Sequence, residues 1–594
     1  MRLCFHQINA NKISLCVRIL VPLVYLAVLS FSISDELFWA DEYVDSVNAE
    51  RQTSFLSLFS TDGFGFFRPI KNGLWFLFIR LNRFGIEWSH LLAIGIGVVS
   101  FFPVLAVLRR VFENEAKALT ATAIWMLSPT LVSSTAWLSC VNVQIMVAFA
   151  TLAIATHDSA WDNGVFRPKR IAAAALFLFL SLFSYECAVA VVPILFLFDL
   201  LLRPERTKTI CARKAYACYL VVVASYLALR FLSPAKLSAG RAWTQCQRWQ
   251  LVVSSPYFTL HHFSTWFWPF NRFSVLGSYE WCAVSPVVLA GCWLIAFAVL
   301  AFIAFFWKRL PVLAFCMLFA LFGFLPTSNC LGFGNGPFGD YYMTLASVGL
   351  AAGFIEIAWR LVSIRGRGRI PALAAVVLFS VVRAAAVIEA GRWSWCWGRG
   401  ERAFAESVRC HPEFVSNKTS YVQYLTDQGR YREAEEIGRE IEAVYGDEPS
   451  RMATVYLSRA LQALNEAHDS QVAFANLELC RQAQNPLVPE HMIEYYRGCV
   501  FDDLLDDSES AEQCYRSALS YKWGFELVPC ADRLGRLLAV KGMRDDAIVL
   551  WEHANETDPD NVSVLWNLSV AYHEAGDIEN AKKCRERVRR LTGQ

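Results

Sequence analysis

The chain has 594 residues, which is too many for one ordinary globular domain, so two to four folding units are expected. Hydrophobic residues make up 55% of the chain and charged residues only 18%, against about 25% in typical soluble domains. This composition excludes a soluble cytosolic enzyme, a disordered chain and a collagen-like fibre, and it predicts a membrane protein.

The near-neutral formal charge of +2 conceals two regions of opposite sign. Residues 1–400 contain 33 Lys and Arg against 19 Asp and Glu, a net charge of +14. Residues 401–594 contain 22 Lys and Arg against 34 Asp and Glu, a net charge of −12. We therefore expect a sparsely charged membrane region, followed by a charged region that is exposed to water.

Eleven stretches of the first region are apolar over about the 20 residues that a helix needs to cross a bilayer. We therefore predict a bundle of about eleven membrane helices. The first stretch is too long for a cleaved signal peptide and is predicted to be an anchor. The stretches are 13–33, 88–108, 118–138, 141–157, 171–185, 186–202, 215–233, 285–306, 311–327, 342–359 and 371–391.

Lys and Arg gather in alternate connections between these stretches, and basic loops stay on the cytoplasmic side of a membrane. With the N-terminus inside, every inside loop is basic, whereas the first outside loop, 34–70, is mostly acidic. An odd number of spans then places the C-terminal region outside. We predict a multi-pass protein of a bacterial inner membrane or the ER membrane, with its C-terminal region in the periplasm or lumen. The inside loops contain Arg109, Arg110 and Lys117; Arg167, Lys169 and Arg170; Arg203, Arg206, Lys208, Arg213 and Lys214; Lys308 and Arg309; and Arg360, Arg365, Arg367 and Arg369.

The long outside segment 234–284 contains an aromatic-rich stretch from Leu251 to Phe270. Trp and Phe favour the level of the lipid headgroups. One further span here would invert every loop that follows and spoil the charge pattern. We therefore expect an interfacial hairpin or an amphipathic helix in this segment.

From about residue 410 the hydropathy falls and a period of 34 residues appears. Gly542 and Gly576 are 34 residues apart, as are Ala547 and Ala581. This spacing resembles that of tetratricopeptide (TPR) repeats, in which small residues let paired helices approach closely. We predict four to six such repeats.

The predicted fold class is thus all-α: a membrane helix bundle followed by a TPR α-solenoid. We place the membrane domain at 1–391, a linker at 392–409 and the repeats at 410–594, with a polar capping helix from Lys582 to Arg590. Solenoids of this kind present a groove to a polypeptide or another partner. The alternative is that the repeats pack onto the membrane domain itself.

Two adjacent carboxylates, Asp41 and Glu42, follow the first predicted span on its outer side. A carboxylate held beside an attacking hydroxyl can act as a general base. The alternative is a solvated acidic loop. We treat both residues as candidate catalytic groups.

Arg68 also follows the first span, and an arginine at a membrane surface can form bidentate bonds with a lipid phosphate. Snorkelling of the side chain to the interface is the alternative. Glu186 lies between two apolar stretches, where ionisable groups line a cavity or find a partner. Asp340 and Tyr341 end a Gly-rich outside turn whose backbone can approach a ligand, although a simple surface loop would have the same composition.

Several site classes find no support in the sequence. It contains no phosphate-binding Gly loop that ends in Lys and Ser or Thr, and no His and Cys cluster with zinc spacing. Its 18 cysteines are scattered and propose no disulfide framework. The basic residues belong to the inside loops, so we expect no nucleic-acid partner, and the need for a divalent metal is left open.

The order of these motifs resembles the GT-C superfamily of membrane glycosyltransferases, and more narrowly the transmembrane-and-TPR O-mannosyltransferases and their bacterial relatives. The sequence departs from that pattern at Glu42, Tyr185 and Gly339-Asp340, where the family often has Asp, Lys and an acidic residue followed by Arg. The resemblance rests on Asp41-Glu42, Phe67-Arg68-Pro69, Ser128-Pro129 with Ser133 and Trp137-Leu138-Ser139, Tyr185-Glu186-Cys187 with Pro193 and Asp199, and Asp340-Tyr341-Tyr342 ahead of Ser347-Val348-Gly349.

The resemblance implies a sugar donor linked to polyprenyl or dolichyl phosphate, which needs no nucleotide site. Asp41 would deprotonate the acceptor hydroxyl, and Glu42 would orient the acceptor or a neighbouring group. Arg68 would hold the departing lipid phosphate, with further donor contacts at Glu186, Asp340 and Tyr341. The acceptor would be Ser or Thr of an exported protein and the sugar mannose; a glycan or lipid acceptor, or a non-catalytic scaffold, are the alternatives.

A reporter fused to the C-terminus tests the predicted topology. Alkaline phosphatase, which folds only outside the cytosol, is expected to be active in this fusion, whereas green fluorescent protein exported in an unfolded state is expected to be dark. The same reporters fused after Lys214, in a predicted inside loop, serve as the control and should give the opposite result. A C-terminal fusion that is active only in the cytosol would refute the outside location of the repeats.

Overall fold

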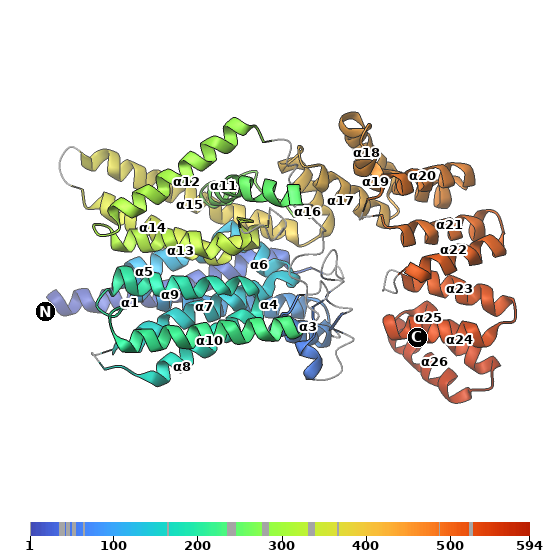
Figure 1. The fold of residues 1–594 in the computed structure, drawn as a ribbon, viewed down its shortest axis with the longest axis horizontal. Helices are drawn as coiled ribbons and strands as arrows, with labels where there is room; N and C mark the ends of the chain where they lie inside the picture. The colour runs from blue at the N-terminus through green and yellow to red at the C-terminus, as the bar shows by residue number, and fades with distance from the viewer. Residues whose placement is uncertain are drawn as a thin grey trace. The chain divides into compact units, whose positions relative to one another are not determined.

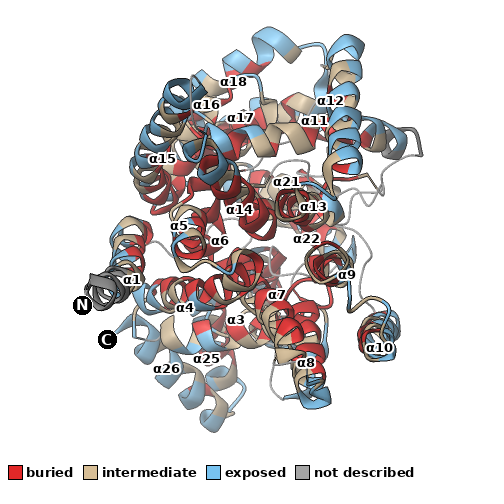
Figure 2. Ribbon diagram, turned by 90° about the vertical axis from the view of Figure 1, so that its left-hand side faces the viewer, coloured by how far each residue is buried: buried red, intermediate tan, exposed pale blue. Residues whose placement is uncertain are grey.

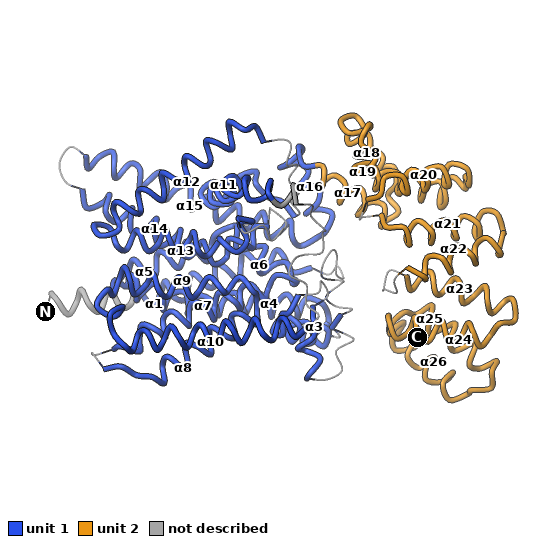
Figure 3. Tube along the Cα trace, viewed as in Figure 1, with its two compact units in different colours: residues 1–414 blue, residues 415–594 orange. Residues whose placement is uncertain are grey.

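The computed structural model describes residues 2–34, 42, 45, 48–49, 55–62, 66–82, 84–162, 165–233, 245–275, 284–330, 339–364, 368–485, 488–521 and 527–593. Every regular element in these ranges is a helix, so the predicted all-α class is confirmed (Figure 1). The chain divides into two compact units, residues 1–414 and 415–594 (Figure 3).

The first unit is built from fourteen helices of eleven or more residues within the described ranges, joined by short 3₁₀ segments. They are α1 (Arg2–Leu29), α3 (Pro69–Asn82), α4 (Glu87–Phe112), α5 (Glu115–Met126), α7 (Val141–Ser159), α8 (Pro168–Ser184), α9 (Val191–Leu202), α10 (Ile210–Leu232), α11 (Gln245–Phe267), α12 (Pro286–Phe306), α13 (Pro311–Phe324), α14 (Met343–Val362), α15 (Arg369–Trp397) and α16 (Gly400–Cys410).

Seven helical segments in the described part of the chain are long and apolar enough to cross a membrane. The predicted count of eleven spans is not confirmed, because four of the predicted stretches fall on shorter helices. The long apolar helices are compatible with a membrane protein. The seven segments are Ser14–Ser32, Glu87–Phe112, Leu138–Ser159, Ile210–Leu232, Pro286–Phe306, Asp340–Val362 and Arg369–Trp397.

The stretch 118–138 shows why the shorter helices differ from the prediction. Helix α5 ends at Met126, and its 12 residues extend about 18 Å, well short of a bilayer. Pro129 follows, and a proline disfavours the helical conformation of the residue before it. Ser128 accordingly has φ −80° and ψ 135°, and three short turns lead to α7.

The stretches 171–185 and 186–202 form α8 and α9, which have 17 and 12 residues. Between them Tyr185 is extended, with φ −159° and ψ 129°, and begins the 3₁₀ segment η6 (Glu186–Ala190). The stretch 311–327 forms α13 and the short turn η8 (Leu325–Thr327), and is likewise a shorter apolar helix. Averaged hydropathy alone could not locate these breaks, because long apolar stretches lie on both sides of each one.

The aromatic stretch Leu251 to Phe270 lies largely on one helix, α11, which contains Pro256 and is not among the seven long apolar segments. Leu251, Phe258 and Trp266 are buried, whereas Trp249 is exposed. A helix with one buried face was one of the two forms expected here, and the described residues form no hairpin between 245 and 267.

Burial differs strongly among the long helices of the first unit. Helices α4, α7 and α14 are largely buried, whereas α10, α12 and α15 expose many apolar side chains (Figure 2). Soluble proteins rarely expose large continuous apolar surfaces. The outer helices therefore have the surface expected of a protein surrounded by lipid.

The basic connections of the first unit meet at one end, which we call the basic end. Arg18 of α1 and Arg109 of α4 both bind Glu115 at the start of α5, with N–O distances of 2.7 Å. Hydrogen bonding from Arg109 lowers the pKa of Glu115 to about 2. Lys117 binds Glu356 near the end of α14 at 2.8 Å. Glu356 therefore makes a contact between α14 and α5.

A buried polar network joins α7, α9 and α10 near the basic end. His157 Nε2 lies 3.0 Å from Asp199 Oδ2, and its Nδ1 lies 2.9 Å from the hydroxyl of Tyr219. Tyr216 donates to the same Asp199 oxygen at 2.7 Å. Asp199 is fully buried, and its bonds to His157 and Tyr216 join α9 to α7 and α10.

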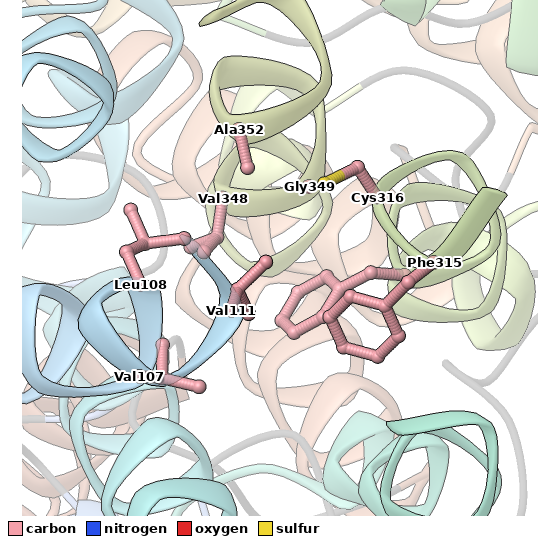
Figure 4. Close-up of a pocket in the computed structure, with 9 residues that line it drawn as sticks. Val107, Leu108, Val111, Phe315, Cys316, Val348, Gly349 and Ala352 are labelled. Atoms are coloured by element: carbon pink, nitrogen blue, oxygen red, sulfur yellow. The ribbon is translucent and has the colours of Figure 1, made fainter. Parts of the chain in front are cut away.

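Close packing of α13 against α14 depends on glycine. A Cβ atom on Gly349 would lie 2.6 Å from the Cys316 carbonyl oxygen and the Ala320 nitrogen, both backbone atoms that cannot move aside. Beside this contact is an apolar cavity of about 10 Å³, which barely admits one water (Figure 4). Phe315 and Val111 flank it, so α4, α13 and α14 form a dry core.

The second unit consists of five successive helical pairs in its described ranges. The last two pairs start 34 residues apart, at 528 and 562, which confirms the predicted helical repeat there. The pairs are α17 (Val415–Asp427) with α18 (Tyr431–Tyr445), α19 (Pro449–Gln462) with α20 (Ser470–Ala483), α21 (Glu490–Leu504) with α22 (Ser508–Tyr521), α23 (Val528–Val540) with α24 (Arg544–Thr557), and α25 (Val562–Glu574) with α26 (Ile578–Thr592).

Small residues allow the two helices of each pair to touch. A Cβ on Gly535 would lie 2.5 Å from the Trp551 ring, and one on Gly498 would lie 2.4 Å from the Tyr515 ring. Gly542 has φ +81°, which suits the turn between α23 and α24. Helix α26 is mostly exposed, as expected of a polar capping helix.

The residues expected to form a linker, 392–409, are helical. Helix α15 continues to Trp397, and α16 covers Gly400–Cys410. Arg392 of α15 pairs with both Glu389 of the same helix and Glu406 of α16. These ion pairs join α16 to the first unit, and the boundary between the two units lies after Phe414.

Substitution of Gly349 tests the contact between α13 and α14. Gly349→Ala is expected to destabilise the purified protein by about 1–3 kcal/mol, because the new Cβ meets backbone atoms. The matched control is Gly291→Ala in α12, where no atom lies within 4 Å of the new Cβ. Thermal unfolding in detergent should show a lower midpoint for Gly349→Ala alone, and equal midpoints for the two variants would contradict the close packing.

Candidate functional site

Five charged side chains gather where α3, η6 and the segment after α1 meet. This charged cluster consists of Asp45, Asp62, Arg68, Lys71 and Glu186, all in the first unit. Its side chains are 26% exposed at most, so they are largely removed from water. A buried charge needs a partner, and every charge in this cluster has one.

Arg68 and Glu186 form the central pair of the cluster. Arg68 Nε donates to Glu186 Oε2 at 2.8 Å and Nη2 donates to Oε1 at 2.7 Å. This bidentate arrangement is the strongest geometry open to an arginine and a carboxylate. It joins the start of α3 to η6 across 118 positions of the sequence.

Aromatic rings cover the guanidinium of Arg68 on both sides. The Arg68 Cζ atom lies 4.2 Å from the Phe66 ring centre and 4.5 Å from that of Tyr185. Cation–π contacts of this kind strengthen as water is excluded. The side chain is therefore held in a fixed direction, with 10% of it exposed.

Asp62 connects Arg68 with Lys71. Its Oδ1 accepts from the Phe66 amide at 2.8 Å, and its own amide donates to the Phe66 carbonyl at 2.7 Å. Asp62 Oδ2 lies 3.4 Å from Arg68 Nη1 and 3.6 Å from Lys71 Nζ. One carboxylate thus fixes the turn before α3 and contacts both cations.

Lys71 lies 2.7 Å from Asp45 Oδ2, and both side chains are at most 3% exposed. Burial by itself would lower the pKa of Lys71, but the carboxylates of Asp45 and Asp62 outweigh it and raise the pKa above its ordinary value. Lys71 therefore stays charged at neutral pH and holds the segment around Asp45 against α3.

The structure describes one of the two predicted catalytic carboxylates, Glu42. Asp41 lies outside the described residues. Glu42 is buried, and its Oε1 accepts from the Leu138 amide at 2.7 Å at the start of the turn η4 (Leu138–Cys140). Glu42 thus binds the backbone before α7, a structural contact that the sequence did not suggest.

Tyr341 lies in the turn η9 (Asp340–Tyr342) at the start of α14. Its ring is 6.0 Å from Trp137 and 4.4 Å from Tyr342. Tyr342 lies near Tyr185, and the Tyr185 ring lies against the Arg68 guanidinium. The structure therefore brings Arg68, Glu186 and the two tyrosines into one region, and Asp340 precedes them in the same turn.

Trp137 forms another wall of this region. It stacks on Trp397 with ring centres 5.3 Å apart, and it precedes Leu138, whose amide Glu42 binds. The element from Ser133 to Ser139, which the sequence singled out, is buried throughout. It contacts Glu42 through the Leu138 amide and Tyr341 through the Trp137 ring.

Sequence reasoning missed Lys71, and it treated Asp45 and Asp62 only as acidic loop residues. A signal was present for Lys71, because it is the one charged residue in the first two turns of α3. It follows Arg68 by three positions, and residues at that spacing share a face of a helix. The carboxylates that pair with it could be identified only from the fold.

No group of three or more His, Cys, Asp or Glu side chains that could hold a metal ion occurs among the described residues. The carboxylates of the charged cluster are instead each paired with Arg68 or Lys71. The chemistry available to this cluster is therefore that of charge pairing and hydrogen bonding.

Comparisons with known proteins add little about this site. No described protein family matches the sequence, and no curated protein matches it either. Among solved structures, one match is the crystal structure of YrrB, described as a TPR protein with an unusual peptide-binding site. It is 18% identical to this chain over 32% of this chain and 93% of that chain, with a TM-score of 0.23.

Substitutions in the central pair test whether the cluster holds the fold together. Arg68→Met alone is expected to cost roughly 3–5 kcal/mol of stability, because it leaves the Glu186 carboxylate buried without its partner. The double variant Arg68→Met and Glu186→Met should cost less than the sum of the two single changes. Denaturant unfolding in detergent, followed by tryptophan fluorescence, gives the three values.

The exposed pair Arg430 and Glu433 of α18 serves as the control, since surface ion pairs contribute little. Its removal should leave the unfolding midpoint nearly unchanged. Additive single effects at Arg68 and Glu186 would show that the two side chains do not stabilise one another.

Proposed function

We propose that this chain is a membrane glycosyltransferase that moves a sugar from a polyprenyl or dolichyl phosphate donor to a hydroxyl acceptor. The observation that carries the proposal is the bidentate Arg68–Glu186 pair, with the Tyr185 ring against the Arg68 guanidinium. It joins positions that the resemblance assigns to donor binding, although they lie far apart in the sequence. The sugar expected from that resemblance is mannose.

Arg68 retains hydrogen-bonding capacity for an anionic ligand. A guanidinium carries five N–H groups, and the Glu186 pair uses two of them while Asp62 makes a long contact with Nη1. The unused N–H groups can donate to a phosphate oxygen while Glu186 keeps the guanidinium in place. Glu186 is then a positioning residue for Arg68.

Two polar groups beside the cluster lack partners, which also supports a ligand site. The Trp137 Nε1 and Ser133 Oγ atoms are buried, and no described group forms a hydrogen bond with either. Buried polar groups are nearly always paired, so each exception needs an explanation. A sugar with several hydroxyl groups would supply acceptors and donors at this wall.

The proposed reaction forms one bond and breaks one. The acceptor hydroxyl oxygen attacks the anomeric carbon of the donor sugar, and the bond from that carbon to the lipid phosphate oxygen breaks with its electron pair. The departing lipid phosphate gains negative charge, which fixed donors such as Arg68 stabilise. The hydroxyl proton passes to a carboxylate, and we assign this role to Asp41.

Of the two roles that the resemblance implies for Glu42, orienting the acceptor or a neighbouring group, its contact supports the second. Its bond to the Leu138 amide would fix the chain immediately after Asp41 against the turn before α7. Glu42 is then a positioning residue for the proposed base, through the backbone.

The second unit is proposed to recruit a polypeptide acceptor, so that the reaction is transfer to Ser or Thr of an exported protein. Transfer to a glycan or lipid is the alternative within enzymes. A non-catalytic scaffold is the alternative outside them, and one observation favours it: every charge of the cluster is already paired. Activity measurements distinguish these three functions.

A transfer assay tests the proposal. The purified chain is incubated with polyprenyl phosphate mannose carrying a radioactive sugar, and with unfolded secreted polypeptides rich in Ser and Thr. Wild type is expected to label the polypeptide. Asp41→Asn should lower the rate by about 10²–10⁴-fold, the usual contribution of a general base.

Asp35→Asn is the matched control, because Asp35 lies in the same acidic segment and has no assigned role. Its rate should equal that of wild type. Equal rates for Asp41→Asn and wild type would remove Asp41 as the base, label on lipid or glycan alone would favour the second enzyme, and no label with any donor would favour the scaffold.

A further inference from the structure

The charges of the second unit are divided unequally between its last helix and the rest. Residues 415–581 contain 14 Lys and Arg against 30 Asp and Glu, a net charge of −16. Residues 582–594, which include most of α26, contain six Lys and Arg against one Glu, a net charge of +5. Helix α26, the last of the chain (Figure 1), therefore presents a basic surface on an otherwise acidic unit.

Four exposed residues form a basic stripe along α26: Ile578, Lys582, Arg585 and Arg589. They are separated by four, three and four residues, and residues at these spacings share one side of a helix. Among the described residues, no carboxylate forms an ion pair with Arg585 or Arg589, whereas Lys583 on another side of the helix pairs with its own neighbour. The two arginines thus remain available to a partner.

Helix α24 carries an acidic stripe with the same spacing. Asp545, Val549, Glu552 and Glu556 are also separated by four, three and four residues, and all four are exposed. They lie on the side of the helix opposite Trp551, which is buried. Each stripe therefore has one apolar residue and three charged ones, of opposite sign in the two helices.

The two stripes are complementary when one of them runs in the reverse direction. The spacing is the same from either end, so in an antiparallel pair Asp545 would oppose Arg589 and Glu552 would oppose Lys582. Helices α24 and α26 are the second helices of successive repeats, and equivalent helices of stacked repeats run in the same direction. A two-fold axis across them would therefore place α24 of one copy antiparallel to α26 of another.

We propose that the second unit binds a second copy of this chain through these stripes, as a two-fold symmetric dimer. The basic stripe of each copy contacts the acidic stripe of the other, so the surface is complementary to itself, as a closed dimer requires. Opposite charges guide the two copies together and fix their register. Val549 and Ile578 are 64% and 59% exposed and add apolar area to each contact.

Charge reversal in the full chain tests this dimer. Wild type in a neutral detergent is expected to be dimeric by native mass spectrometry at low ionic strength, and added salt should release monomers because it screens exposed charges. Arg585→Glu with Arg589→Glu makes both stripes acidic. This variant should weaken dimer formation about 100-fold, since each altered ion pair occurs twice in the interface.

Asp545→Lys with Glu556→Lys makes both stripes basic and should weaken dimer formation to a similar extent. When this variant is mixed with the acidic one, the two chains are expected to form a heterodimer, because each again meets a stripe of opposite charge. The mixture separates a lost contact from a lost fold, since both variants must be folded to pair.

Arg432→Glu with Arg536→Glu is the matched control, because both arginines are exposed elsewhere in the second unit. It changes the net charge as much as the α26 variant does, and its dimer should persist. Loss of this dimer as well would show that only the total charge matters, and would overturn the proposed interface.

Wild type that stays monomeric at low ionic strength would also overturn the proposal, as would a dimer that survives Arg585→Glu with Arg589→Glu, or mixed variants that stay apart. Monomers that retain phosphatidylglycerol only when Arg585 and Arg589 are present would make a lipid the occupant instead. Transferase activity is not a readout here, so failure of the proposed reaction would leave this result unchanged.

Discussion

The burial of charge in an apolar helical unit is the constraint on which the rest of this structure depends. The charge of Arg68 is tolerated there because Glu186 accepts two short hydrogen bonds from the guanidinium group, at 2.8 and 2.7 Å. That geometry offsets the loss of hydration, which isolated charges cannot do. The pair also fixes the start of α3 against η6, and Asp62 extends the same connection to Lys71 and the segment around Asp45.

Two buried arginines of this unit therefore represent opposite solutions to one problem. Arg68 has protein carboxylates around it and offers only its remaining N–H groups to a ligand. Arg383 of α15 has the Trp266 carbonyl and the Trp266 ring beside it. The first charge is offset by carboxylates of the protein, whereas the second has a neutral carbonyl as its hydrogen-bond partner.

Much of the architecture followed from sequence pattern, because helical periodicity and repeat spacing are local properties. Gly542 and Gly576 are 34 residues apart, and each has a positive φ in the turn between the two helices of its pair. The breaks at Ser128 and Tyr185 were missed, since apolar residues on both sides conceal an extended residue from a hydropathy average. An ion pair from Arg392 to Glu406 joins α16 to α15, a contact that the sequence pattern did not indicate.

The sequence by itself determined the helical class, the division of charge between the two regions and the residue types available at the site, since these depend on composition and neighbouring positions. Tertiary structure alone decided which charges meet. Arg68 and Glu186 are separated by 118 residues, and nothing local selects Glu186 as the partner or binds Glu42 to the Leu138 amide. Such pairing is fixed only when helices pack, because a charge that is removed from water must take its partner from whatever the fold brings within hydrogen-bonding distance.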